Sequence, residues 1–125
     1  MRLIRLTAAL LLLVLSAGCG KEPGQGEADQ DDPVAQGRKL FMANGCNLCH
    51  GPEGRGDGPV ARSLSPKPRD FADLSAYKRG PGLEQLEETI QKGLHTGQGI
   101  MPAFPNIPSE DRRRLALFIQ SLQPK

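Results

Sequence analysis

Apolar side chains recur at helical spacing in three segments of the chain, and nowhere do they alternate as in a half-buried strand. The segments are residues 33–44, 83–93 and 109–122; their apolar positions are Val34, Leu40 and Phe41, then Leu83, Leu86 and Ile90, then Leu115, Phe118, Ile119 and Leu122. This pattern predicts an all-α domain of about three main helices.

End signals flank each predicted helix. Asp32 can cap the first helix, and Pro33 suits its first position because the proline ring holds a helical φ. Gly93 follows the second helix, where a glycine commonly ends one, and Ser109 is the predicted cap of the third. Gly37 lies within the first helix, and its missing side chain is expected to let another helix approach closely.

Between the first two helices, residues 45–80 are rich in glycine and proline and are expected to be mostly irregular. The chain has 15 Gly and 11 Pro, 4% aromatic residues and no Trp, so large apolar side chains are scarce. A domain this small is only marginally stable without a disulfide, a metal or a cofactor. A long irregular segment in a compact domain usually has a function. Both features favour a buried cofactor that supplies apolar surface.

Residues 1–18 have the composition of an export signal peptide. Arg2 and Arg5 precede an apolar run of about ten residues, which is too short to cross a bilayer core of ~30 Å. Three small residues follow and then Cys19, so the segment resembles a bacterial lipoprotein signal, in which that cysteine is acylated. Ser16 stands where such signals prefer a Leu-type residue. Ordinary signal cleavage near the same site is the alternative.

Residues 19–32 are predicted to be a lipidated N-terminus and a flexible acidic tether, because they hold five acidic residues and no large apolar side chain. The predicted domain, residues 33–125, carries 13 basic and 9 acidic residues in a chain of formal net charge +2. No basic stripe with interleaved aromatic residues is present, so nucleic acid is not an expected partner. We expect a monomer that a lipid anchor holds on the periplasmic side of a bacterial membrane.

The strongest chemical signal is a Cys-X-X-Cys-His motif formed by Cys46, Cys49 and His50. This spacing is typical of c-type haem attachment, in which both thiols bond the porphyrin edge and the adjacent imidazole binds iron. Zinc sites and thioredoxin-like redox pairs use related cysteine patterns. A zinc site needs a fourth ligand and a thioredoxin-like motif needs a βαβ setting, and the sequence indicates neither.

With this motif the chain resembles the class I, mono-haem c-type cytochromes over residues 33–122. The resemblance is carried by G-R-K-L-F, C-N-L-C-H-G, G-D-G-P, G-I-M-P-A-F and a closing amphipathic helix. It implies a small cytochrome c-like globule wrapped around one covalently attached haem c. It also implies that Gly37 and Phe41 pack against the apolar face of the last helix.

The resemblance also assigns the distal iron ligand to Met101, which precedes a proline. His95 is the rival because imidazole also binds iron well. Met42 is expected to lie in the core. A metal-binding histidine usually donates its second ring N–H to an acceptor, and the resemblance makes the carbonyl of Pro59 the candidate for His50.

Several further side chains are candidates for the haem surroundings. Leu64, Phe71, Tyr77 and Phe104 either form the haem walls or propionate edge or pack in an ordinary core. Arg69 either pairs with a haem propionate or is a surface residue, and the surface position is the favoured prediction.

With His50 and Met101 on both axial positions, a haem iron has no open site for oxygen, peroxide or a substrate. The expected function is therefore transfer of single electrons between respiratory redox partners rather than enzymatic catalysis. Two alternatives stay open. One is a haem enzyme or gas-binding sensor with a displaceable sixth ligand, and the other is a haem subunit of a larger respiratory complex.

Overall fold

The computed structural model describes residues 31–96 and 99–125. The predicted export signal, Cys19 and most of the predicted tether lie outside the described residues. The elements are the helices α2 (Pro33–Ala43), α3 (Cys46–His50), α4 (Leu83–Lys92) and α5 (Ser109–Ser121), the 3-10 helices η1 (Ala61–Ser63) and η2 (Leu74–Ala76), and the strands β1 (Leu94–Thr96) and β2 (Gly99–Met101). The three predicted helices are thus confirmed to within one residue at each end.

Helices α2 and α5 begin in different ways. The carboxylate of Asp32 accepts a hydrogen bond from the Val34 N–H at 2.8 Å, so the predicted cap of α2 is confirmed. The predicted cap of α5 is wrong, because Pro108 takes the cap position and Ser109 is the first helical residue. The carbonyl of Pro108 already accepts the first helical bond, from the Arg112 N–H at 2.9 Å. A proline can do this because the cap position needs only its carbonyl.

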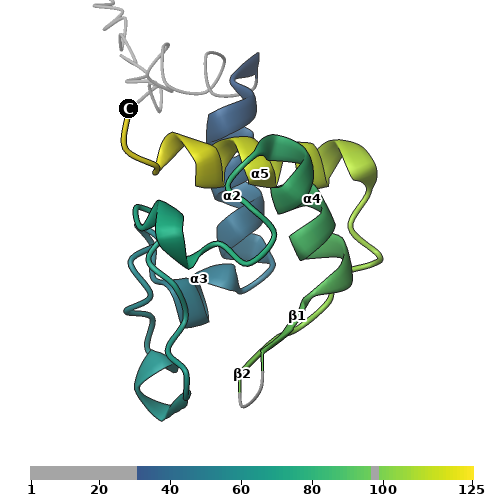
Figure 1. The fold of residues 1–125 in the computed structure, drawn as a ribbon. Helices are drawn as coiled ribbons and strands as arrows, with labels where there is room; N and C mark the ends of the chain where they lie inside the picture. Colours follow the sequence, from purple (N-terminus) through teal and green to yellow (C-terminus); the bar gives the residue numbers. More distant parts are fainter. Residues whose placement is uncertain (1–30, 97–98) are drawn as a thin grey trace, which may run out of the picture.

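The α2–α5 crossing is the central packing contact, and Figure 1 shows α5 running across α2 near one end of the molecule. A Cβ built on Gly37 would collide with the backbone carbonyl of Arg114 and lie 2.9 Å from the Cβ of Phe118. Phe41 meets Phe118 edge-on, with ring centroids 5.3 Å apart. The predicted glycine–aromatic crossing is therefore confirmed, since only glycine permits so close an approach.

The hydrophobic core lies between these helices and α4. Its buried members are Phe41, Phe71, Leu86, Ile90, Leu115, Ala116, Phe118 and Ile119. All but Phe71 come from the three long helices. The remaining parts, α3, the irregular segment of residues 51–80 and the β1–β2 hairpin, extend below this helical layer (Figure 1). The all-α fold is confirmed, with the short helix α3 and the irregular segment on one side of the core.

A short antiparallel hairpin is the element that sequence patterning missed. Strands β1 and β2 pair Leu94 with Met101 and His95 with Ile100. Each strand has only three residues, which is too few to show an alternation of apolar and polar positions. Across the described ranges, no helix is both long and apolar enough to cross a bilayer.

Candidate functional site

The Cys-X-X-Cys-His motif forms a one-turn helix, α3, between two glycines. Gly45 before it and Gly51 after it have φ values of 72° and 76°, so both take left-handed conformations that favour glycine. A single helical turn separates the two thiols and sets His50 beside Cys49. Both cysteines are half-buried free thiols. Burial raises the pKa of the Cys46 thiol to about 11, so at neutral pH it is protonated before any covalent attachment.

Cys46 and Cys49 open onto a large cavity between α3, the irregular segment and the hairpin. Its volume is about 920 Å³, near the upper end of the ~300–1,000 Å³ typical of cofactor and ligand sites. A smaller apolar recess adjoins it and reaches the core residues Phe41 and Ile90. Seven residues line both spaces: Cys46, His50, Arg69, Lys78, Leu94, Met101 and Phe104. The large cavity thus joins the recess that reaches the hydrophobic core.

His50 is held against the irregular segment by two contacts. Its Nδ1 lies 3.4 Å from the carbonyl oxygen of Arg69, and its ring stacks on Phe71 with centroids 4.6 Å apart and planes 23° apart. The predicted acceptor, Pro59, is therefore wrong. The carbonyl of Arg69 takes its place because residues 68–71 fold back beside α3. A donor at Nδ1 makes Nε2 the nitrogen with the free lone pair.

Burial lowers the pKa of His50 from 6.5 to about 4, and the nearby Arg69 charge acts in the same direction, although the bond to the Arg69 carbonyl opposes it. The imidazole is therefore neutral at physiological pH. A neutral imidazole is the form that binds a metal.

Met101 lies on β2, half-buried, and lines both the cavity and the recess. Its segment is fixed to the end of α4. Gly93, with φ +69°, passes so close that an added Cβ would lie 2.6 Å from the Met101 carbonyl oxygen. The Phe104 N–H donates to the Ile90 carbonyl at 2.9 Å. These contacts hold the thioether-bearing strand on the cavity wall.

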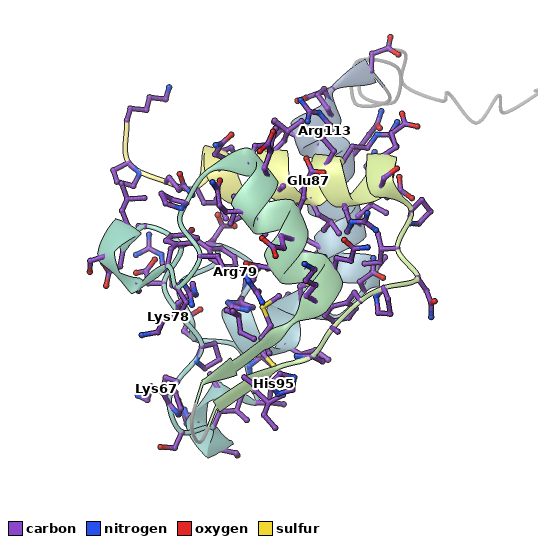
Figure 2. The ribbon with its side chains drawn as sticks, turned by 45° about the vertical axis from the view of Figure 1, so that its right-hand side comes forward. Lys67, Lys78, Arg79, Glu87, His95 and Arg113 are labelled. Atoms are coloured by element: carbon purple, nitrogen blue, oxygen red, sulfur yellow. The ribbon has the colours of Figure 1, made fainter. Side chains whose placement is uncertain are left out.

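The other two candidates for the distal position lie elsewhere. His95, labelled in Figure 2, is exposed on β1. It does not line either the cavity or the recess. Its neighbour Leu94 lines both. Met42 was predicted to lie in the core, and this is wrong, since it is 46% exposed on α2. The core face of α2 is instead taken by Gly37 and Phe41.

Four cationic side chains line the cavity or the recess: Lys67, Arg69, Lys78 and Arg79. No carboxylate lines either space in the described part of the chain. Arg69 is half-buried rather than fully exposed, and its guanidinium lies 5.0 Å from the centre of the Tyr77 ring; its pairing with a haem propionate stays a prediction. Sequence reasoning did not single out the two lysines or Arg79, because isolated cations in an irregular segment have no diagnostic spacing.

This lining fits the cofactor that the motif predicts. A haem has an apolar macrocycle, two propionate carboxylates, and an iron that takes nitrogen and sulfur ligands. The site offers an apolar recess and a cationic lining, together with an imidazole, a thioether and two thiols on one cavity. The predicted wall residues Leu64, Phe71, Tyr77 and Phe104 all line the cavity or the recess.

The alternative uses of the cysteine motif find no support in the same geometry. Within residues 31–96 and 99–125, no three His, Cys, Asp or Glu side chains gather as a metal-binding group. A tetrahedral zinc site needs four such ligands. The thioredoxin-like alternative needs a βαβ unit, whereas the two strands described here pair with each other in a hairpin.

Comparison with known proteins identifies relatives of this chain. The chain is 35% identical over 94 residues to a cbb3-type cytochrome c oxidase subunit, CcoP, of Helicobacter pylori, covering 73% of this chain and 28% of that subunit. Among solved structures it resembles a chain of the Kuenenia stuttgartiensis reducing HAO-like protein complex, with a TM-score of 0.60 and 30% identity, covering 70% of this chain and 41% of that one.

A second solved structure, the KustC0563 c-type cytochrome, matches 70% of this chain and 98% of its own, with a TM-score of 0.52 and 24% identity. That likeness supports the fold. The chain spans less than a third of the oxidase subunit and less than half of the complex chain. Residues 34–123 match the sequence profile of cytochrome c. The chain therefore belongs to the cytochrome c family, its cofactor is covalently bound haem c, and it takes part in electron transfer.

Proposed function

We propose that this protein is a lipid-anchored, mono-haem electron shuttle on the periplasmic side of a bacterial membrane and that it is not an enzyme. Cys46 and Cys49 would bond the porphyrin, and His50 and Met101 would hold the iron. The observation that carries the proposal is that the imidazole, the thioether and both thiols line one cavity. When bound, the haem supplies a one-electron couple whose potential is raised by the His/Met ligand pair.

The residues around the cavity support a transfer role. Residues on both sides of the cavity are fixed by short contacts to the protein frame, His50 through Arg69 and Phe71, and the Met101 segment through Ile90 and Gly93. Ligands held in this way resist displacement and rearrange little when the charge at the site changes. Two haem propionates are costly to bury without positive partners, and Lys67, Arg69, Lys78 and Arg79 would compensate their charge.

The proposed anchor rests on the sequence around Cys19. Each buried methylene of an acyl chain contributes about 0.8 kcal/mol, so several chains together would hold the protein firmly to a bilayer. The domain begins at α2, at residue 33, which leaves the preceding acidic stretch as the connection to that anchor.

Two measurements on the native protein test the proposal. An intact mass should equal the chain from Cys19 plus one haem and the acyl chains. The reduced protein should show a sharp c-type α band and bind carbon monoxide slowly or not at all. A mass without haem, or rapid carbon monoxide binding at neutral pH, would contradict the shuttle; the second result would favour the enzyme or gas sensor.

The likeness to an oxidase subunit motivates a second candidate, a haem subunit of a larger respiratory complex. Mild detergent extraction followed by size-exclusion chromatography separates the two. A free carrier elutes as a monomer with all of its haem signal, whereas a complex subunit elutes with other haem proteins in fixed ratio.

A further inference from the structure

We propose that residues 68–77, here called the strap, set the orientation and basicity of His50, with Phe71 and Tyr77 as positioning residues. The inference rests on the proposed function, in which His50 binds the haem iron. It concerns how the chain tunes that ligand.

The strap touches both polar and flat surfaces of the imidazole. The Arg69 carbonyl lies 3.4 Å from Nδ1, on the edge of the ring. The Phe71 ring covers one flat face, nearly parallel at 23° and with centroids 4.6 Å apart. The contact with the Arg69 carbonyl opposes movement of the Nδ1 edge of the imidazole. The stack on Phe71 opposes movement of its flat face. Together they define one orientation of the imidazole.

Phe71 is itself held in place from three directions. Its ring meets Phe41 edge-on at a centroid distance of 6.1 Å, and only 5% of the residue is exposed. Its N–H donates to the Gly54 carbonyl at 2.8 Å. Its own carbonyl accepts a hydrogen bond from the Tyr77 hydroxyl at 2.9 Å. The ring that stacks on His50 is therefore a fixed surface rather than a mobile one.

Tyr77 closes the strap on itself. While its hydroxyl bonds Phe71, its ring lies under the Arg69 guanidinium at 5.0 Å. Tyr77 thus links Arg69, whose carbonyl contacts His50, to Phe71, whose ring stacks on it. Such a cation–π contact contributes modestly by itself, but here it joins both contacts to His50 in one unit.

The glycines after the motif make room for the strap. Gly54 and Gly56 have φ values of 69° and 73°. A Cβ on Gly54 would overlap the Phe71 ring, and one on Gly56 would lie 3.0 Å from the carbonyl carbon of Pro68. The Gly56 N–H also donates to the His50 carbonyl at 2.8 Å. The loop is therefore shaped so that the strap lies directly against His50.

The consequence is electronic. A histidine that donates from Nδ1 is a more basic ligand through Nε2, and a more basic ligand favours the oxidised metal. Weakening the strap should lengthen the Nδ1 contact, make His50 less basic and raise the reduction potential. It should also change the orientation of the His50 imidazole or allow a wider range of orientations, and the g values of the oxidised protein report this orientation.

Three variants of the full holoprotein test this inference. Phe71→Leu removes the stack and keeps apolar volume, and Tyr77→Phe removes only the hydroxyl. Phe118→Leu is the matched control, because Phe118 is 3% exposed and also meets Phe41 edge-on, but it lines neither the cavity nor the recess that His50 lines. Reduction potential, electron paramagnetic resonance g values and thermal unfolding are measured for each.

We expect Phe71→Leu to raise the potential and change the g values, Tyr77→Phe to do so in the same direction by less, and Phe118→Leu to leave both as in the unchanged protein. Unfolding temperatures should fall similarly for the two leucine variants. Unchanged g values and potential in Tyr77→Phe and Phe71→Leu would overturn the inference, as would an equal shift in Phe118→Leu. Failure of the proposed function gives a different result from failure of this inference. In that case the unchanged protein itself would lack the low-spin electron paramagnetic resonance signal of His/Met ligation.

Discussion

Replacing Gly37 by alanine tests the helix crossing on which the domain depends. Alanine favours a helix over glycine by about 1 kcal/mol, so a free α2 would gain stability. Against this, the new Cβ would lie 2.7 Å from the Arg114 carbonyl carbon and 2.9 Å from the Phe118 Cβ. The first neighbour is backbone, so relief requires α2 and α5 to separate. That movement loosens Phe41 and Leu115, the two largest fully buried side chains.

Overpacking of this kind costs about 1–3 kcal/mol, and a backbone neighbour places Gly37→Ala at the upper end. After the propensity gain, the expected net loss is about 2 kcal/mol. For a domain of this size, each 1 kcal/mol lowers the melting temperature by about 4–8 °C, so Gly37→Ala should melt about 8–16 °C lower.

The assay is thermal unfolding of the haem-loaded protein followed by far-ultraviolet circular dichroism. Ala35→Gly, two residues away on the same helix at a half-buried position, is the control for the change in helix propensity, with an expected loss of about 1 kcal/mol. A Gly37→Ala protein that melts at or above the temperature of the unchanged protein would refute the close crossing.

Three other outcomes are expected. Met101→Ala should lower the reduction potential and lose the weak far-red absorption band of iron–sulfur bonding. Met42→Ala, at an exposed position, should leave the potential and the band unchanged. A band retained in Met101→Ala would point to another ligand. Cys46→Ala should leave a single thioether, seen as a longer-wavelength pyridine haemochrome band, while Cys19→Ala should keep the haem and lose the membrane-bound fraction. In the protein without haem, stability to denaturant should fall as the pH drops from 6.5 to about 4, because in that window the unfolded chain protonates His50 and the folded chain does not. Equal stability of the haem-free protein at pH 7 and pH 5 would contradict the burial of this imidazole.

The haem-attachment motif and the three long helices could be predicted without a structure. The Cys46–His50 motif is contiguous, so its meaning depends only on spacing that the chain itself provides. The three long helices follow from apolar residues repeated over three or more turns, a signal strong enough to place their ends within one residue. The resemblance to cytochromes c likewise identified the crossing at Gly37.

Contacts between distant, irregular segments needed the tertiary structure. The β1–β2 hairpin is too short to leave a pattern, and the exposure of Met42 depends on which face of α2 meets α5. The acceptor for His50 lies 19 residues away, at Arg69, rather than at Pro59. No local rule relates two positions joined by a glycine-rich loop.

The sequence by itself therefore determined the attachment motif, the helical class and the identity of the cofactor, because each rests on residues close together in the chain. Only the tertiary structure decided that Met101 faces the cavity while His95 does not, and that cations from separate turns gather on its lining. The physical reason is that burial and charge at a site are sums over neighbours in space, and those neighbours are fixed by packing rather than by spacing along the chain.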